Sequence, residues 1–241
     1  MLAVFEKSTG KPPDELSLPL KGMPDLKTGE ETVEIFHSWR PHSMLSIVVV
    51  DDVYCIFLGM LENTCDLRSH YGLSRQVTEA MVVVEAYKVL RDRTPYPPDQ
   101  VVRDLQGKFA FVLFDARANT LFIARDRDGC IPLQWRMARD GSLVCSDDPN
   151  VIAEACGNCC TFFPPGFPLF FTQYILHFAL STCIYMSGDH PLNKIRAITW
   201  EDDEGNISSV LFQVDLFTRL RSIPRTDSSA NWAGVTTVDG E

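Results

Sequence analysis

Residues Gly107–Asp115 read GKFAFVLFD and residues Thr120–Arg125 read TLFIAR, and together they are the clearest structural signal in the chain. Both segments are rich in aromatic and aliphatic residues, and Ala116–Asn119 supplies a short link between them. The pattern predicts two antiparallel strands joined as a hairpin. Alternation along the strands then predicts which side chains face the interior of the sheet: Phe109, Phe111, Leu113, Leu121 and Ile123.

Further strands are predicted on both sides of this hairpin. Leu45–Val50 and Val53–Leu58 are nearly all apolar, and Asp51-Asp52 between them indicates a second hairpin. Shorter apolar segments predict the remaining strands, at Met1–Phe5, Pro132–Met137, Ser142–Ser146, Ile195–Thr199 and Val210–Val214. Residues 6–31 lack periodicity, which indicates a loop with at most one short helix at Pro13–Ser17.

Two helices are predicted between the two hairpins. Leu61–His70 suits a short helix that ends before Tyr71-Gly72, because glycine readily takes the left-handed conformation of a helix cap. Ser74 or Thr78 can cap a longer helix, whose apolar residues recur at helical spacing as far as Leu90. Strands therefore outnumber helices, which favours an α+β fold with helices packed on antiparallel sheets.

The composition excludes several classes of partner. The chain has 241 residues, of which 45% are hydrophobic and 22% charged, as in an ordinary globular protein. Its formal net charge is −10 and it has no long run of lysine and arginine, which disfavours nucleic acids and anionic membrane surfaces. The first residues lack the pattern of a secretory signal, so we expect a cytoplasmic protein with reduced cysteines, the nucleus being an alternative.

The eight cysteines do not predict a metal site. Cys156 and Cys159 form a single CxxC pair followed by Cys160, whereas a structural zinc site needs a second pair at a suitable spacing. We therefore expect ordinary thiols, no metal and no cofactor.

A long stretch without charges raises the question of a membrane span. No charged residue occurs from Ala155 to Gly188, and Phe167–Met186 has the length of a transmembrane helix. Prolines precede it, polar residues such as His177 interrupt it, and basic residues that would anchor its ends are missing. We therefore expect an apolar insertion at about residues 167–188 of a soluble domain, with a membrane-tethered protein as the alternative.

A charge cluster follows the second strand of the central hairpin. Arg125, Asp126, Arg127 and Asp128 alternate in sign immediately before Gly129. One reading is an ion-paired turn, and the other is a surface that binds a ligand or a partner at the mouth of the hairpin.

The same segment carries a resemblance to a known superfamily. Three consecutive segments resemble the corresponding strands of class II glutamine amidotransferase domains, such as the N-terminal domain of asparagine synthetase. They are LQGKFAFVLFD at Leu105–Asp115, LFIARDR at Leu121–Arg127 and GCIPL at Gly129–Leu133. The resemblance implies an N-terminal-nucleophile hydrolase fold, a sandwich of two antiparallel sheets with helices on the outer faces.

Two shorter motifs narrow the resemblance to one plant family. The sequence is similar to that of the aluminium-induced proteins with YGL and LRDR motifs, which include stem-specific and wheat aluminium-induced proteins. The motifs are Tyr71-Gly72-Leu73 and Leu90-Arg91-Asp92-Arg93, followed by Pro95–Pro98. This resemblance implies a protein that responds to aluminium and other stresses.

Residues at the positions implied by the amidotransferase resemblance do not match its chemistry. Leu2 stands where the superfamily has its cysteine nucleophile, and Leu58 stands where an asparagine side chain completes the oxyanion hole. The oxyanion glycine is matched by Gly59. Met44 is the nearest match to the arginine that binds the substrate carboxylate, and Glu79 matches in part the acid that binds the substrate amine.

We therefore expect a protein without glutaminase activity and with a binding or regulatory role. Its partner would be a protein or a small molecule, and a homodimer is one option. The alternative is a residual amidohydrolase or ligand-binding enzyme that uses a different nucleophile. We expect one domain at residues 1–225 and a frayed tail at residues 226–241.

Overall fold

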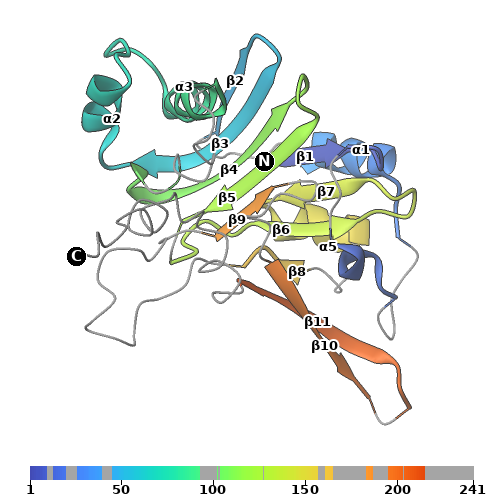
Figure 1. Ribbon diagram of the computed structural model, residues 1–241. Coiled ribbons are helices and arrows are strands. Elements are labelled where there is room, and N and C mark those ends of the chain that lie inside the picture. Colours follow the sequence, from blue (N-terminus) through green and yellow to red (C-terminus); the bar gives the residue numbers. More distant parts are fainter. Residues whose placement is uncertain are drawn as a thin grey trace, which may run out of the picture.

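The computed structural model describes residues 1–9, 13–19, 26–39, 45–92, 102, 104–126, 128–156, 161–164, 183–186, 195–202 and 204–214. Within them, two antiparallel sheets lie face to face, and helices cover the outward-facing side of each (Figure 1). This order of layers is the α+β sandwich that the resemblance implied. The predicted tail at residues 226–241 and the domain boundary at residue 225 lie outside the described residues.

The first sheet has five strands, in the order β2, β3, β4, β5 and β9. The bounds are Leu45–Val50 for β2, Val53–Leu61 for β3, Gly107–Asp115 for β4, Thr120–Arg125 for β5 and Cys183–Met186 for β9. Both hairpins predicted from the sequence are present, with Val50 opposite Val53 in one and Asp115 opposite Thr120 in the other.

The second sheet has four strands, in the order β1, β7, β6 and β8. The bounds are Leu2–Phe5 for β1, Leu143–Ser146 for β7, Gln134–Met137 for β6 and Thr161–Phe162 for β8. The edge strand β1 pairs with β7 far along the chain, with Leu2 opposite Ser146.

The prediction that five hairpin side chains share one face of the sheet is wrong, because the residues chosen on β4 and those chosen on β5 lie on opposite faces. Phe109, Phe111 and Leu113 pack together on the outer face, whereas Leu121 and Ile123 belong to the cluster between the sheets. Cross-strand partners lie on the same face, and Leu113 is opposite Phe122 rather than Leu121. All five side chains are nevertheless buried, because this sheet is covered on both faces.

Helices form the two outer layers. α3 (Glu79–Asp92) packs on β2 and β3, with α2 (Thr64–His70) beside it, while α1 (Gly29–Trp39) and α5 (Pro149–Cys156) pack on the four-stranded sheet. The predicted short helix is present as the 3-10 helix η1 (Asp14–Ser17). α2 begins three residues later than predicted because β3 extends to Leu61.

Helix α1 begins within the last residues of the predicted loop at residues 6–31 and continues beyond it. Its first turn forms a capping box, in which the Glu31 amide donates to Thr28 Oγ1 at 3.2 Å and the Thr28 amide donates to Glu31 Oε2 at 2.7 Å. Thr28-Gly-Glu-Glu31 is therefore the sequence signal that could have found this helix.

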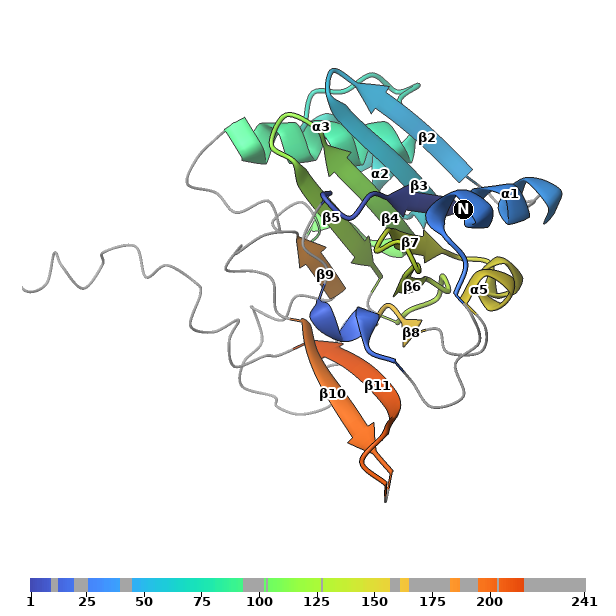
Figure 2. The ribbon, with the colours of Figure 1, turned by 90° about the vertical axis from the view of Figure 1, so that its right-hand side faces the viewer.

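The strands β10 (Ile195–Glu201) and β11 (Ile207–Val214) form a separate two-stranded ribbon. It projects away from the two sheets in both views (Figures 1 and 2). Phe212 anchors it, because this buried ring lies 5.4 Å from the ring of Trp135, measured between centroids.

The apolar insertion predicted at residues 167–188 is only partly described. Cys183–Met186 forms β9, which pairs with β5 at the edge of the five-stranded sheet. Residues 165–182 and 187–194 lie outside the described residues. Among the helices that the structure describes, none is long and apolar enough to cross a membrane.

Candidate functional site

Leu58 and Gly59 lie next to each other on β3, where the resemblance implies the oxyanion hole. Leu58 is opposite Ala110 on β4, and its side chain is 4% exposed in the cluster between the two sheets. Gly59 has a φ of +97°, and a Cβ atom there would lie 2.1 Å from the backbone oxygen of Lys108. Only glycine fits this position, so its presence is explained by the close approach of β4.

Leu2 lies in β1 and packs on the other side of the four-stranded sheet from Leu58. Its partly buried side chain contacts the outer cluster formed by Ala138, Val144 and Ile152. The inward-facing neighbour is Met1, whose side chain is buried in the cluster that also contains Leu58. The Met1 amine forms an ion pair with the carboxylate of Asp147.

The remaining degenerate positions do not complete a common site within the described residues. Glu79 is the first residue of α3 and is half-buried in the helical layer outside the five-stranded sheet. Met44 lies outside the described residues. Leu2, Leu58 and Glu79 thus belong to three different layers of the fold.

The YGL motif closes the turn after α2. Tyr71 and Leu73 pack against the cluster beneath α3, and Gly72 adopts the predicted left-handed conformation with a φ of +66°. Burial and the carboxylate of Asp104, which accepts a hydrogen bond from the hydroxyl, raise the pKa of Tyr71. These contacts give the motif a structural role.

The LRDR motif fastens the end of α3 to the central hairpin. Arg91 Nη1 lies 2.9 Å from Asp115 Oδ2, and the Tyr87 hydroxyl donates to the same oxygen at 3.1 Å. The other oxygen of Asp115 accepts from the amides of Arg117 and Ala118. Leu90 and Asp92 also lie in the last turn of α3, where the exposed Asp92 pairs with Arg91, and Arg93 is outside the described residues.

This network determines the ionisation of the buried carboxylate. Burial opposes the charge on Asp115, but the hydrogen bonds from Arg91, the Ala118 amide and the Tyr87 hydroxyl outweigh it and lower the pKa of Asp115. The side chain of Asp115 is fully buried while that of Arg91 is a quarter exposed. The motif is therefore a clamp rather than a reactive group.

Two of the four residues in the charge cluster at the end of β5, Arg125 and Asp126, are buried and so do not belong to a surface. Arg125 is 7% exposed and donates to the backbone oxygens of Phe163 and Gly129. Asp126 is 3% exposed, and its carboxylate accepts from the amides of Asp128 and Cys130. The hydrogen bonds of Arg125 and Asp126 therefore stabilise the loop between β5 and β6. Asp128 is exposed, and Arg127 lies outside the described residues.

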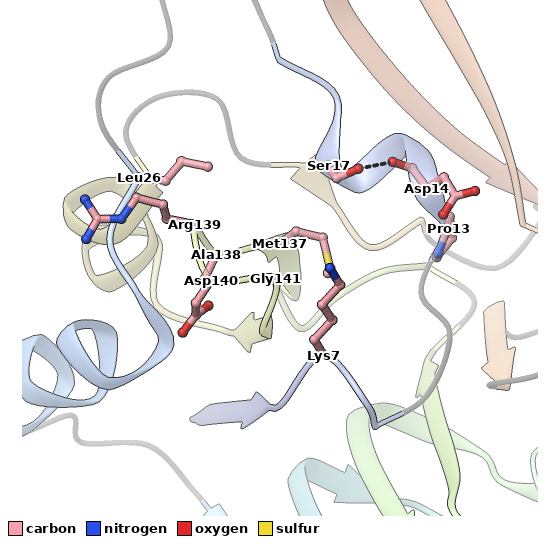
Figure 3. A pocket seen from close by; sticks show the side chains of 10 residues that line it. All are labelled: Lys7, Pro13, Asp14, Ser17, Leu26, Met137, Ala138, Arg139, Asp140 and Gly141. Atoms are coloured by element: carbon pink, nitrogen blue, oxygen red, sulfur yellow. Dashed lines mark hydrogen bonds between the residues drawn. The ribbon is translucent and has the colours of Figure 1, made fainter.

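A pocket of about 700 Å³ opens beside the turn that connects β6 and β7 (Figure 3). Lys7 extends into it from the segment after β1, and Asp14 lies on its other side in η1. Neither side chain forms an ion pair with another described residue. The full lining consists of Lys7, Pro13, Asp14, Ser17, Leu26, Met137, Ala138, Arg139, Asp140 and Gly141.

Another charged residue of the lining, Asp140, ties the β6–β7 turn to the start of α1. Asp140 accepts from the Gly29 amide at the start of α1 and from the Ser142 amide, each at 3.0 Å. Sequence reasoning missed the pocket because its lining joins residues near the N-terminus to the β6–β7 turn, which lies far along the chain. The Asp140-Gly141 turn was its only local signal.

The cysteines show no metal cluster in the part of the chain that the structure describes. No group of three or more histidine, cysteine, aspartate or glutamate side chains is placed there to hold a metal ion. Cys55 and Cys145 are buried thiols, and burial raises the pKa of Cys145 to about 12. Cys159 and Cys160 of the predicted CxxC segment lie outside the described residues.

Comparison with known proteins adds two kinds of relative. A family model described as "Aluminium induced protein" matches residues 44–214. The chain is 56% identical over 149 residues to the stem-specific protein TSJT1 of Nicotiana tabacum, an alignment that covers 52% of this chain and 100% of that protein.

More distant similarity reaches asparagine synthetases and an amidotransferase of known structure. The chain is 39% identical over 70 residues to a probable asparagine synthetase of Dictyostelium discoideum, covering 28% of this chain and 12% of that protein. A glutamine phosphoribosylpyrophosphate amidotransferase structure from B. subtilis aligns with 53% of this chain and 28% of that chain, at 17% identity and a TM-score of 0.38. The chain thus spans only a small part of these enzymes.

Proposed function

The chain belongs to the aluminium-induced protein family, and from that premise we propose that it is a stress-responsive protein in which an amidotransferase-like domain binds rather than hydrolyses. The family is related in sequence to the glutamine amidotransferase domains of asparagine synthetases. The proposed role is regulatory, in the cytoplasm, and exerted through a small molecule or a protein partner.

The packing of Leu58 carries the proposal that glutamine is not hydrolysed. An oxyanion hole needs hydrogen-bond donors aimed at the developing charge. Leu58 offers an aliphatic side chain that is buried among the residues between the sheets. Leu2, at the position of the nucleophile, has no reactive group and packs toward the opposite side of its sheet.

A glutaminase assay tests this part of the proposal. We expect glutamate release by the wild-type protein to equal that of a heat-denatured control. Leu2→Cys alone should also be inactive, because Leu58 would still lack the donor whose loss typically costs ~10²–10³ in rate. Steady turnover by the wild-type protein would instead support a residual amidohydrolase with a different nucleophile.

The pocket beside the β6–β7 turn supports the binding role. Lys7 and Asp14 present opposite charges at its sides, and its size suits a small molecule. We expect a zwitterion such as glutamine, glutamate or asparagine to be a suitable ligand. A thermal-shift titration with these amino acids tests the assignment. The amino acids should raise the Tm of the wild-type protein but not that of Lys7→Met. Lys108→Met, which removes an exposed lysine, is the control and should show the same rise in Tm as the wild-type protein. No shift in the wild-type protein would contradict this assignment and favour a protein partner.

A further inference from the structure

The edge strand β2 exposes a row of large apolar side chains. Leu45, Ile47 and Val49 are 39%, 62% and 56% exposed, and Tyr54, opposite Val49 on β3, is 47% exposed. All four lie on one face, because alternate residues of a strand and directly opposite residues of neighbouring strands point the same way. We call this row the β2 face.

The β2 face continues the surface that forms the core between the two sheets. Leu45 is opposite Leu58 and Ile47 is opposite Ile56, and both of these β3 side chains pack in the cluster between the sheets. The four-stranded sheet covers β3 and β4 but leaves the outermost strand open. Apolar surface of the kind that is buried elsewhere in the sandwich is therefore exposed here.

The backbone edge of β2 is open as well. Within the described residues, β2 pairs with β3 on one side and with no strand on the other. Its sequence, LSIVVV, contains no charged residue and no proline, whereas edge strands usually carry such residues to prevent pairing with another chain. An uncharged edge next to an apolar face has the features of a pairing surface.

We propose that β2 is the homodimer interface of this protein, through which two copies join their five-stranded sheets edge to edge. A twofold axis perpendicular to the sheet pairs the two strands antiparallel and keeps both β2 faces on the same side. Placing the axis at Ile47 sets Ile47 opposite Ile47 of the partner subunit, and Leu45 opposite Val49 of the partner subunit. Every exposed side chain of the strand then meets an apolar side chain.

The apolar self-complementarity of β2 favours a second copy in this register, and the acidic groups do not oppose it. Each chain carries a net charge of −10, so two copies can associate only where the acidic groups are kept apart. The nearest acidic side chain is Asp51, which already pairs with Lys88 at 2.8 Å. With the axis at Ile47, the two Asp51 residues lie eight residues apart along the paired strands, or about 27 Å. This separation is well beyond the Debye length of ~8 Å at physiological salt.

Light scattering of the purified full chain, coupled to size-exclusion chromatography, tests the proposal. We expect the wild-type protein to have about twice the monomer mass of 27.1 kDa at micromolar concentration. Ile47→Lys places two ammonium groups together on the axis and should weaken association at least about a hundredfold, which leaves a monomer. The matched control is Leu211→Lys, which adds the same charge at a 51% exposed leucine of β11 and should leave the dimer intact.

A cysteine pair tests the register without relying on loss of association. Ile47→Cys brings two thiols face to face across the axis, so mild oxidation should give a disulfide-linked dimer on non-reducing gels. Ser46→Cys points to the opposite face of the strand and should cross-link no more than the wild-type protein, which sets the background from the exposed Cys65 and Cys130.

Three outcomes would overturn the proposal. The first is a wild-type protein that is monomeric at tens of micromolar, which is also the result expected if β2 serves a different protein. The second is a dimer that persists in Ile47→Lys while circular dichroism shows a native fold. The third is equal cross-linking of Ile47→Cys and Ser46→Cys, which would exclude the antiparallel register.

Discussion

Replacing Asp115 by alanine tests whether the LRDR motif works as a structural clamp. The substitution removes the acceptor of four hydrogen bonds, from Arg91 Nη1, the Tyr87 hydroxyl and the amides of Arg117 and Ala118. It thereby detaches the last turn of α3 from the end of the β4–β5 hairpin.

The expected loss of stability depends on whether each hydrogen-bond donor finds another acceptor once the carboxylate of Asp115 is removed. The buried hydroxyl of Tyr87 loses its acceptor, which costs about 1–3 kcal/mol. Arg91 is a quarter exposed and keeps its contact with Asp92, so its loss is discounted to about 1 kcal/mol. The two turn amides are only partly buried and can bind water instead. We expect the free energy of unfolding to fall by about 2–4 kcal/mol at pH 7.

The pH dependence gives an independent check. The pKa of Asp115 is lower in the folded protein than in the unfolded chain, so its contribution is complete above the unfolded value of about 3.9. That contribution is lost as the pH falls through the folded pKa. The difference in stability between the wild-type protein and Asp115→Ala should therefore stay constant from pH 7 to about 4 and narrow at lower pH.

Urea unfolding followed by circular dichroism measures both quantities. Asp92→Ala is the matched control, because Asp92 pairs with the same arginine but is 63% exposed and should cost no more than about 0.5 kcal/mol. A loss below ~1 kcal/mol for Asp115→Ala, or equal losses for the two variants, would refute the clamp.

Four other substitutions probe the fold by the same measurement. Phe111→Ala should cost about 3–5 kcal/mol because its ring is fully buried under α3, and a loss under ~1 kcal/mol would contradict that placement. Gly59→Ala should prevent stable folding, since its Cβ would collide with β4, whereas Gly72→Ala meets open space and should cost only about 1–2 kcal/mol. Thr28→Ala should cost about 1 kcal/mol through loss of the α1 cap, and an unchanged stability would mean that the capping box contributes nothing.

Local patterns were enough to predict the strands other than β8 and β9, together with the helices α2 and α3. The hairpins at β2–β3 and β4–β5 were identified because each combines two apolar runs with a short link. The turn at Gly72 was identified because glycine has a distinct conformational preference. α1 was missed, although the spacing of Thr28 and Glu31 is a helix-start signal that needs no knowledge of the fold.

Burial of charged residues could not be predicted in the same way. Arg125 and Asp126 look like surface residues along the sequence, yet their partners lie on a loop that depends on β8 and on the path after β5. The pocket beside Lys7 has the same origin, because residues from the N-terminal segment meet the β6–β7 turn only after the second sheet has formed. The face assignment of Leu121 failed because both faces of its sheet are covered, which removes the alternation of polar and apolar residues.

The pairing of β1 with β7 has a consequence for synthesis on the ribosome. The two strands are about 140 residues apart, as the partners Leu2 and Ser146 show. At 5–20 residues per second, β1 leaves the ribosome roughly 7–28 s before its partner has been made. During that interval the five-stranded sheet can form its hairpins, whereas the apolar side chains of β1 have no sheet to join. We therefore expect the last-forming part of the sandwich to contain the first strand of the chain, and a nascent chain stalled before Leu143 to depend on chaperones.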